Sequence, residues 1–238
     1  MPRAIDVTHS AAGDPREGFW SPEYLRHTQR RLEHLASLRL ELAGRSVLEV
    51  GAGIGDHTSF FLDRGCEVVV TEGRSENLHV LRELYPARDV RLLSLDPPPD
   101  EPPLVADVVY CYGLLYHLSD PRAALEFMAR ACRSLLLLET CVSFGDQVAV
   151  NPVVERGESP TQALTGSGCR PTRPWVWNQL RGLFEFVYAT TTQPWHEEFP
   201  LDWGRPREGL ARAVFIGSRL PIESAVLTDR LPSVHTRH

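Results

Sequence analysis

The sequence contains no lysine, so arginine supplies all 25 of its basic residues. Acidic residues number 31, and the formal net charge is −6. No basic tract is present, whereas proteins that hold nucleic acid present clustered positive charge. We therefore expect no nucleic-acid partner.

Long apolar runs are also absent. The run Leu135 to Leu138 is far shorter than the roughly 20 residues that a membrane-spanning helix needs. The first residues, Met1 to Asp6, have no apolar stretch of the kind that forms a signal peptide. These absences predict a cytoplasmic protein that does not associate with a membrane.

Cysteine is sparse and shows no pairing pattern. The five cysteines form no CxxC pair and are odd in number. This arrangement indicates neither a disulfide framework nor a zinc site. We predict small buried residues and no bound metal.

Short β-rich runs alternate with helical stretches, which is typical of a sheet covered by helices on both faces. At 238 residues, the chain is short enough for one core. The first five predicted strands are Val47 to Val50, Cys66 to Thr71, Val90 to Ser94, Val105 to Cys111 and Ser134 to Thr140. The predicted helices are Ser21 to about Leu42, His57 to Arg64, Ser75 to Tyr85, Pro121 to Ala131 and Trp175 to Leu183.

After the fifth strand the pattern changes, because residues 141–174 are rich in Gly, Pro, Ser and Thr. Two further strands are predicted at Phe184 to Thr190 and Ala211 to Ser218, joined by a long polar loop. The expected organisation is a tail and cap helix (1–42), a cofactor-binding core (43–140), an insertion lining the acceptor site (141–183), a terminal hairpin (184–219) and a loose tail (220–238).

A glycine-rich turn follows the first predicted strand. Gly51, Gly53 and Gly55 alternate where the buried strand gives way to a helix, which permits positive φ angles and close approach of a ligand to the backbone. Glu72 ends the next strand about twenty residues later and is suited to accept hydrogen bonds from both ribose hydroxyls of a nucleotide. A dinucleotide fingerprint requires glycine where Asp56 stands, and Asp56 and Glu49 would repel a pyrophosphate. The spacing favours a sulfonium nucleotide.

This run resembles the first motif of the class I S-adenosylmethionine-dependent methyltransferases, an acid-x-Gly-x-Gly-x-Gly sequence. The resemblance covers about residues 45–140, and the terminal hairpin resembles the last two strands of that family. It implies an α/β, seven-stranded Rossmann-like fold whose mostly parallel sheet ends in an antiparallel hairpin. It also implies S-adenosyl-L-methionine as cofactor and S-adenosyl-L-homocysteine as product.

Carried over to this sequence, the resemblance assigns cofactor binding to Glu49, Gly51, Gly53, Gly55, Glu72, Asp96 and Cys111. Asp96 matches the position that usually contacts the adenine amino group. It also immediately precedes three prolines, so a turn-initiating role remains an equal alternative.

The segment from Cys111 to Pro121 resembles a Leu-Tyr-His-x-x-x-Pro subset of the family, which includes tRNA wobble-uridine carboxymethyltransferases and many small-molecule methyltransferases. His117 is a candidate general base for a hydroxyl acceptor, and the alternative is that it only forms a hydrogen bond with the loop or with a neighbouring carboxylate. Glu139, at the end of the fifth strand, is a candidate partner of His117 or of an acceptor amine. His196 completes the candidate catalytic residues; it lies in the aromatic loop, Gln193 to Trp203, within the connection between the last two strands.

Candidate acceptor-binding residues come from several segments. Arginine binds carboxylate and phosphate groups bidentately, although the arginines here also stand at a helix start. The candidates are Tyr116, Arg170, Arg173, Trp195 and Glu197. The adjacent His196, Glu197 and Glu198 lack the ligand spacing of a strong metal motif.

The predicted function is methyl transfer to an oxygen or nitrogen of a small-molecule acceptor, with secondary metabolism as one setting. In-line displacement at the methyl carbon needs alignment and exclusion of water, but no metal. A tRNA-modifying carboxymethyltransferase and a non-catalytic nucleotide-binding module remain alternatives. The oligomeric state stays open, and a homodimer is compatible with the sequence.

Overall fold

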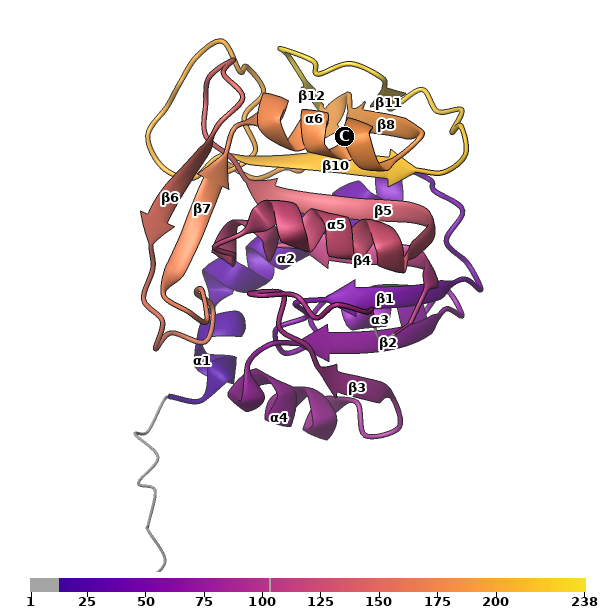
Figure 1. Ribbon diagram of the computed structural model, residues 1–238, viewed down its shortest axis with the longest axis vertical. Helices are drawn as coiled ribbons and strands as arrows, with labels where there is room; N and C mark the ends of the chain where they lie inside the picture. Colours follow the sequence, from indigo (N-terminus) through magenta and orange to yellow (C-terminus); the bar gives the residue numbers. More distant parts are fainter. Residues whose placement is uncertain (1–12, 103) are drawn as a thin grey trace, which may run out of the picture.

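The computed structural model describes residues 13–102 and 104–238, and residues 1–12 of the predicted tail lie outside this range. An eight-stranded sheet runs through the centre in the order β11-β8-β10-β5-β4-β1-β2-β3 (Figure 1). Its strands are β1 Ser46–Val50, β2 Glu67–Glu72, β3 Asp89–Leu92, β4 Ala106–Tyr112, β5 Cys132–Cys141, β8 Phe186–Thr190, β10 Arg212–Ser218 and β11 Leu227–Thr228.

The five strands from β1 to β5 pair in parallel, and β10 inserts antiparallel between β5 and β8. This confirms the predicted mostly parallel sheet with an antiparallel hairpin. The short strand β11 adds an eighth member by pairing antiparallel with β8.

Helices cover both faces of the sheet. They are α1 Pro15–Phe19, α2 Pro22–Ser37, α3 Thr58–Leu62, α4 Ser75–Leu84, α5 Pro121–Ala131 and α6 Arg173–Leu183, with a short 3₁₀ helix η1 at Leu115–His117. Helices α5 and α6 supply one apolar cluster, and α2 and α3 supply another on the opposite face. Strands buried on both faces read as continuous apolar runs, as in Leu135 to Leu138 of β5.

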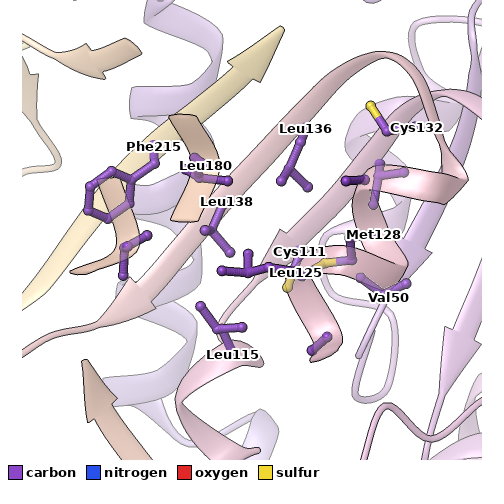
Figure 2. Packing of buried hydrophobic residues seen from close by; sticks show 14 of the residues in the cluster. Val50, Cys111, Leu115, Leu125, Met128, Cys132, Leu136, Leu138, Leu180 and Phe215 are labelled. Carbon is purple, nitrogen blue, oxygen red and sulfur yellow. The ribbon is translucent and has the colours of Figure 1, made fainter. Parts of the chain in front are cut away.

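Alternate residues of β5 divide between the two apolar clusters. Leu136 and Leu138 pack with α5 and α6, together with Leu125 and Leu180 (Figure 2). Leu135 and Leu137 belong to the cluster on the opposite face. This alternation follows from the two-residue period of a β-strand.

Helix ends follow local capping chemistry. Asp120 caps α5 by accepting hydrogen bonds from the Arg122 and Ala123 backbone amides, as its place before Pro121 predicts. Helix α2 begins after Ser21 as expected but ends at Ser37, not near Leu42. Arg39 has a φ of 53°, and this left-handed conformation cannot continue an α-helix.

Two segments are more ordered than their composition predicted. The insertion holds a separate antiparallel hairpin, β6 Val150–Val154 with β7 Ser167–Pro171, which projects beyond the sheet near α1 (Figure 1). The predicted loose tail instead packs on the domain through β11 and through β12 Thr236–Arg237, which pairs with β9 Thr192–Gln193. Within the described ranges, no helix is both long enough and apolar enough to span a bilayer.

Candidate functional site

A pocket opens where four neighbouring parallel strands end at their carboxyl edge. Its walls include residues directly after β1, β2, β3 and β4. Helices α1, α2 and α4, the 3₁₀ helix η1 and the insertion supply further walls. Ligands of open α/β sheets bind at this edge, so the topology places a ligand site here.

The glycine turn forms the floor of this pocket. Gly51 and Gly53 have φ angles of 69° and 62°, which favour glycine. A Cβ at Gly53 would lie 2.6 Å from Phe19 of α1, and one at Gly51 would lie 2.8 Å from Leu114. Gly55 is not on the pocket wall, because it packs against Tyr85, whose hydroxyl donates to its carbonyl at 2.8 Å. Its contact with the cofactor stays a prediction.

Glu72 lines the pocket in a fixed orientation. One carboxylate oxygen accepts from the Gly53 amide at 2.8 Å, and the other accepts from the Arg74 amide at 2.9 Å. Burial raises the pKa of the Glu72 carboxyl. The backbone bonds hold this acid against the glycine turn, at the position predicted for the ribose.

Glu49 also lines the pocket and is buried. It accepts from the Thr58 hydroxyl at 2.7 Å, and burial raises its pKa to about 7. Several other buried polar atoms around the pocket have no hydrogen-bond partner: Arg31 Nε, Asp56 Oδ2, Asn77 Oδ1 and the Tyr112 hydroxyl. Because buried polar groups are normally paired, these atoms mark surfaces that a polar ligand would satisfy.

Asp96 lines the pocket, but its carboxylate already has partners. It accepts from the Ser119 amide at 3.1 Å, from the Ser119 hydroxyl, and from the Thr165 hydroxyl at 3.1 Å. Its adenine contact remains a prediction. Cys111 does not reach the pocket wall, since it is fully buried among core residues (Figure 2), and burial raises the pKa of its thiol to about 12.

His117 lies on the pocket wall and is hydrogen-bonded through Nδ1 to Glu155. Glu155 also accepts from Arg170 at 3.2 Å and from the Ala163 amide at 2.8 Å. Burial lowers the pKa of His117 and outweighs the opposing effect of the carboxylate. Burial alone would raise the pKa of Glu155, but its hydrogen-bond donors together lower it to about 2. The pair therefore combines a neutral imidazole with an ionised carboxylate.

Glu155 was not among the predicted residues, because it follows β6 in an insertion that carries no periodic signal. The predicted partner, Glu139, is not beside His117. It is fully buried and forms ion pairs with Arg31 at 3.2 Å and Arg212 at 3.1 Å. The two arginines come from α2 and β10, so sequence separation hid this cluster.

Three predicted acceptor residues, one on η1 and two in the insertion, bind other protein groups and do not line the pocket. The Tyr116 hydroxyl accepts from Arg212 at 3.1 Å, and Arg170 is committed to Glu155. Arg173 donates to the Pro232 carbonyl at 2.8 Å and lies over the Trp203 ring. None of Tyr116, Arg170 and Arg173 is among the residues that line the pocket.

The predicted acceptor loop also lies apart from the pocket. Trp195 is 56% exposed, and its indole donates to the His238 carbonyl at 2.8 Å. Glu197 forms an ion pair with Arg26 on α2. His196 is buried against His27, also on α2, with ring centroids 4.7 Å apart. The structure therefore does not bring Trp195, His196 or Glu197 to the pocket wall.

A segment of the insertion instead covers the pocket. Pro160, Thr161, Gln162 and Leu164 contribute to the wall. Arg74, two residues after Glu72, donates through one guanidinium nitrogen to the carbonyls of Gly157, Gln162 and Ala163. Residues 157–166, the covering loop, are thus fastened directly beside the predicted ribose site.

Comparison with solved structures finds the same architecture. The N-terminal domain of EvdMO1 with S-adenosylhomocysteine bound aligns with a TM-score of 0.61 and 21% identity, covering 91% of this chain and 89% of that domain. An S-adenosylmethionine-dependent methyltransferase from Mesorhizobium loti aligns with a TM-score of 0.57 and 16% identity, covering 80% of this chain and 98% of that one. Residues 48–134 match the family model described as a methyltransferase domain. This region is therefore similar to a methyltransferase domain, and the chain shares the fold of these solved methyltransferases.

Two curated proteins are similar to this chain over less than half of its length. A ubiquinone biosynthesis O-methyltransferase from Xanthomonas euvesicatoria is 37% identical over 110 residues, 44% of this chain and 44% of that protein. A tRNA U34 carboxymethyltransferase from Alteromonas mediterranea is 31% identical over 126 residues, 48% of this chain and 38% of that protein. The match therefore spans about two fifths of the length of these relatives.

The glycine turn and Glu72 fall within the matched region, so the methyltransferase core carries the predicted cofactor site. The methyltransferase match and the neighbour with S-adenosylhomocysteine bound support S-adenosylmethionine as the cofactor and S-adenosylhomocysteine as the product. Glu155 and the covering loop lie outside the residues that match the family model.

Proposed function

We propose that this methyltransferase transfers the methyl group of S-adenosylmethionine to a hydroxyl oxygen of a small-molecule acceptor, with His117 as general base. The observation that carries the proposal is the hydrogen bond between His117 Nδ1 and the buried Glu155 carboxylate. When Nδ1 donates its proton to Glu155, the lone pair of the neutral ring is on Nε2. The glycine turn and Glu72 line the same pocket as His117.

The reaction balances without a further reagent. The acceptor oxygen attacks the methyl carbon, the carbon–sulfur bond breaks, and its electron pair remains on sulfur in S-adenosylhomocysteine. His117 Nε2 takes the hydroxyl proton as the oxygen–carbon bond forms. Glu155 orients the ring and stabilises the imidazolium, as a carboxylate partner does for histidine bases in other enzymes.

Cofactor binding is assigned to the residues that already face the pocket. Glu72 would accept from the ribose hydroxyls, and the positive φ angles at Gly51 and Gly53 shape the backbone beneath the nucleotide. The unpartnered polar atoms of Arg31, Asp56 and Tyr112 would contact polar groups of the cofactor or acceptor. These assignments rest on pocket geometry together with the similarity to a methyltransferase domain.

Two related proteins support an oxygen acceptor. The ubiquinone biosynthesis relative is named an O-methyltransferase. The N-terminal domain of EvdMO1 was also crystallised in the presence of D-fucose, a compound that bears several hydroxyl groups. A hydroxylated small molecule is therefore the first acceptor class to test.

The test incubates the protein with S-adenosylmethionine and a panel of phenols and sugars. Mass spectrometry then detects products heavier by one methylene. With an acceptor that turns over, His117→Ala should lower kcat by about 10²–10⁴-fold while the cofactor Kd stays unchanged. His79→Ala, at an exposed position on α4, is the matched control. Turnover of His117→Ala within a few-fold of wild type would contradict its role as a base.

The tRNA alternative rests on the carboxymethyltransferase relative. A net charge of −6 opposes it, because binding to the phosphate backbone depends on basic residues. Unmodified tRNA in the same assay tests this alternative directly. Cofactor binding without product from any acceptor would instead favour a non-catalytic nucleotide-binding module.

A further inference from the structure

The aromatic loop between β9 and β10 brings a pair of histidines together with a carboxylate. His196 and Glu198 belong to this loop, and His27 belongs to α2. Their ligand atoms all lie within 4.8 Å of one another. Spacing within the loop did not indicate a metal motif, because the second histidine is supplied from a helix far away in sequence.

Burial singles out His27. Its side chain is 8% exposed, and its Nε2 atom is buried without a hydrogen-bond partner. This nitrogen lies 3.7 Å from Glu198 Oε2. An unpartnered ring nitrogen is costly to bury, so the position is suited to a ligand that the nitrogen can bind.

We propose that His27, His196 and Glu198 bind one divalent transition-metal ion. Two imidazoles and one carboxylate form a mixed nitrogen and oxygen donor set, which suits Zn²⁺, Co²⁺ and Fe²⁺. Mg²⁺ and Ca²⁺ prefer oxygen ligands and would bind poorly. The remaining coordination positions would be filled by water.

The surroundings supply supporting contacts for these ligands. Arg212 Nε donates to Glu198 Oε2 at 2.5 Å, which leaves Oε1 available to the ion. His196 Nε2 lies 3.7 Å from Glu197, which can orient the ring, and His196 Nδ1 accepts from the Glu198 amide at 3.2 Å, a contact that must give way where Nδ1 binds the ion. Metal-binding histidines and carboxylates commonly have such outer partners.

Charge also shapes the site. The positive charges of Arg31 and Arg212 face the buried Glu139, and Arg212 also faces Glu198. Glu197 is the nearby acid best placed to offset the added charge of the ion.

A bound ion would link the aromatic loop to α2, the helix that lines one side of the pocket. Tyr24 and Thr28, on either side of His27 in α2, line the pocket. The ion would therefore lie behind this wall rather than in it. Its expected effects are on stability and on the position of α2, and they do not depend on the proposed methyl transfer.

The test titrates Co²⁺ into untagged, chelator-treated protein and follows its visible absorption, with Zn²⁺ and Mg²⁺ as competitors. We expect one Co²⁺ per chain, displacement by Zn²⁺ but not by Mg²⁺, and no thiolate charge-transfer band. His27→Ala and Glu198→Gln should each weaken Co²⁺ binding about tenfold or more. His79→Ala, at an exposed histidine, should leave it unchanged.

Thermal denaturation with and without Zn²⁺ provides the second measurement and also shows whether the variants fold. Zn²⁺ should raise the midpoint of wild type and of His79→Ala, but not that of His27→Ala or Glu198→Gln. The proposal is overturned if wild type binds no Co²⁺ or if its affinity survives in both ligand variants. If His27→Ala does not fold, the Co²⁺ affinity of Glu198→Gln and the wild-type spectrum decide whether these residues bind the ion.

Discussion

At the scale of single residues, the contact between His117 and Glu155 sets the conditions under which the proposed base works. Burial holds the pKa of His117 below its usual value of 6.5. The ring is therefore neutral, and able to accept a proton, throughout the range above that value. Glu155 opposes the effect of burial, so it sets how far the pKa falls.

A pH profile of kcat tests this balance. The wild-type rate should stay level from pH 8 to 6.5 and decline only below it, as His117 becomes protonated. Glu155→Gln removes the charge that raises the pKa of His117, so the acidic decline should move to lower pH. Its kcat should also fall about tenfold or more, because the imidazolium loses its partner. A decline that moves to higher pH would contradict the assignment.

Glu72 is the residue on which the cofactor site depends most. Glu72→Ala should weaken S-adenosylmethionine binding by about 1–3 kcal/mol, because the ribose hydroxyls lose a charged acceptor. Isothermal titration calorimetry measures this change. Glu67→Ala, at an exposed position at the start of the same strand, is the control. Equal S-adenosylmethionine affinities in the two variants would mean that the ribose binds elsewhere.

At the scale of helices and strands, the sequence predicted those features that are determined by neighbouring residues in the chain. The period of the apolar residues placed the seven main strands, and Asp120 with Pro121 placed the start of α5. The glycine turn and Glu72 were found because both follow buried strands that end at the same edge. Local patterns thus identified the part of the pocket where we predict the cofactor.

The rest of the site depends on contacts between distant segments, which no local pattern encodes. Glu139 appeared to face the pocket, but two arginines from α2 and β10 enclose it. Glu155 reaches His117 only because β6 and β7 form a hairpin outside the main sheet. The aromatic loop predicted to bind the acceptor packs on α2 instead, as the pairing of Glu197 with Arg26 illustrates.

The covering loop is the element whose movement matters most for ligand access. Arg74→Ala removes three hydrogen bonds to its carbonyls. Since each bond contributes about 0.5–1.5 kcal/mol, trypsin cleavage after Arg156 should become about tenfold faster or more. Mass spectrometry identifies the cut, and Arg82→Ala, on the exposed surface of α4, is the control. Unchanged cleavage would show that other contacts hold the loop.

At the scale of the whole molecule, one buried charge cluster joins both ends of the fold. Glu139 on β5 pairs with Arg31 from the N-terminal helix α2 and with Arg212 from the late strand β10. All three side chains are almost fully buried. Removing one member of such a cluster leaves charges that water cannot solvate.

Glu139→Gln should therefore lower the free energy of unfolding by about 3–5 kcal/mol. Urea denaturation followed by circular dichroism measures the loss, and Glu67→Gln at the exposed end of β2 is the reference variant. A change below 1 kcal/mol would indicate that the two arginines find other partners, as for an ordinary surface substitution.

The five cysteines, all buried and unpaired, make this protein convenient for site-specific labelling. Maleimides react with exposed thiolates and will label these positions slowly. Amine-reactive dyes find no lysine side chain in the sequence. In Glu158→Cys, on the exposed surface of the covering loop, the new thiol would react ahead of the buried ones. A fluorophore at that position would report opening and closing of the loop as S-adenosylmethionine enters and S-adenosylhomocysteine leaves.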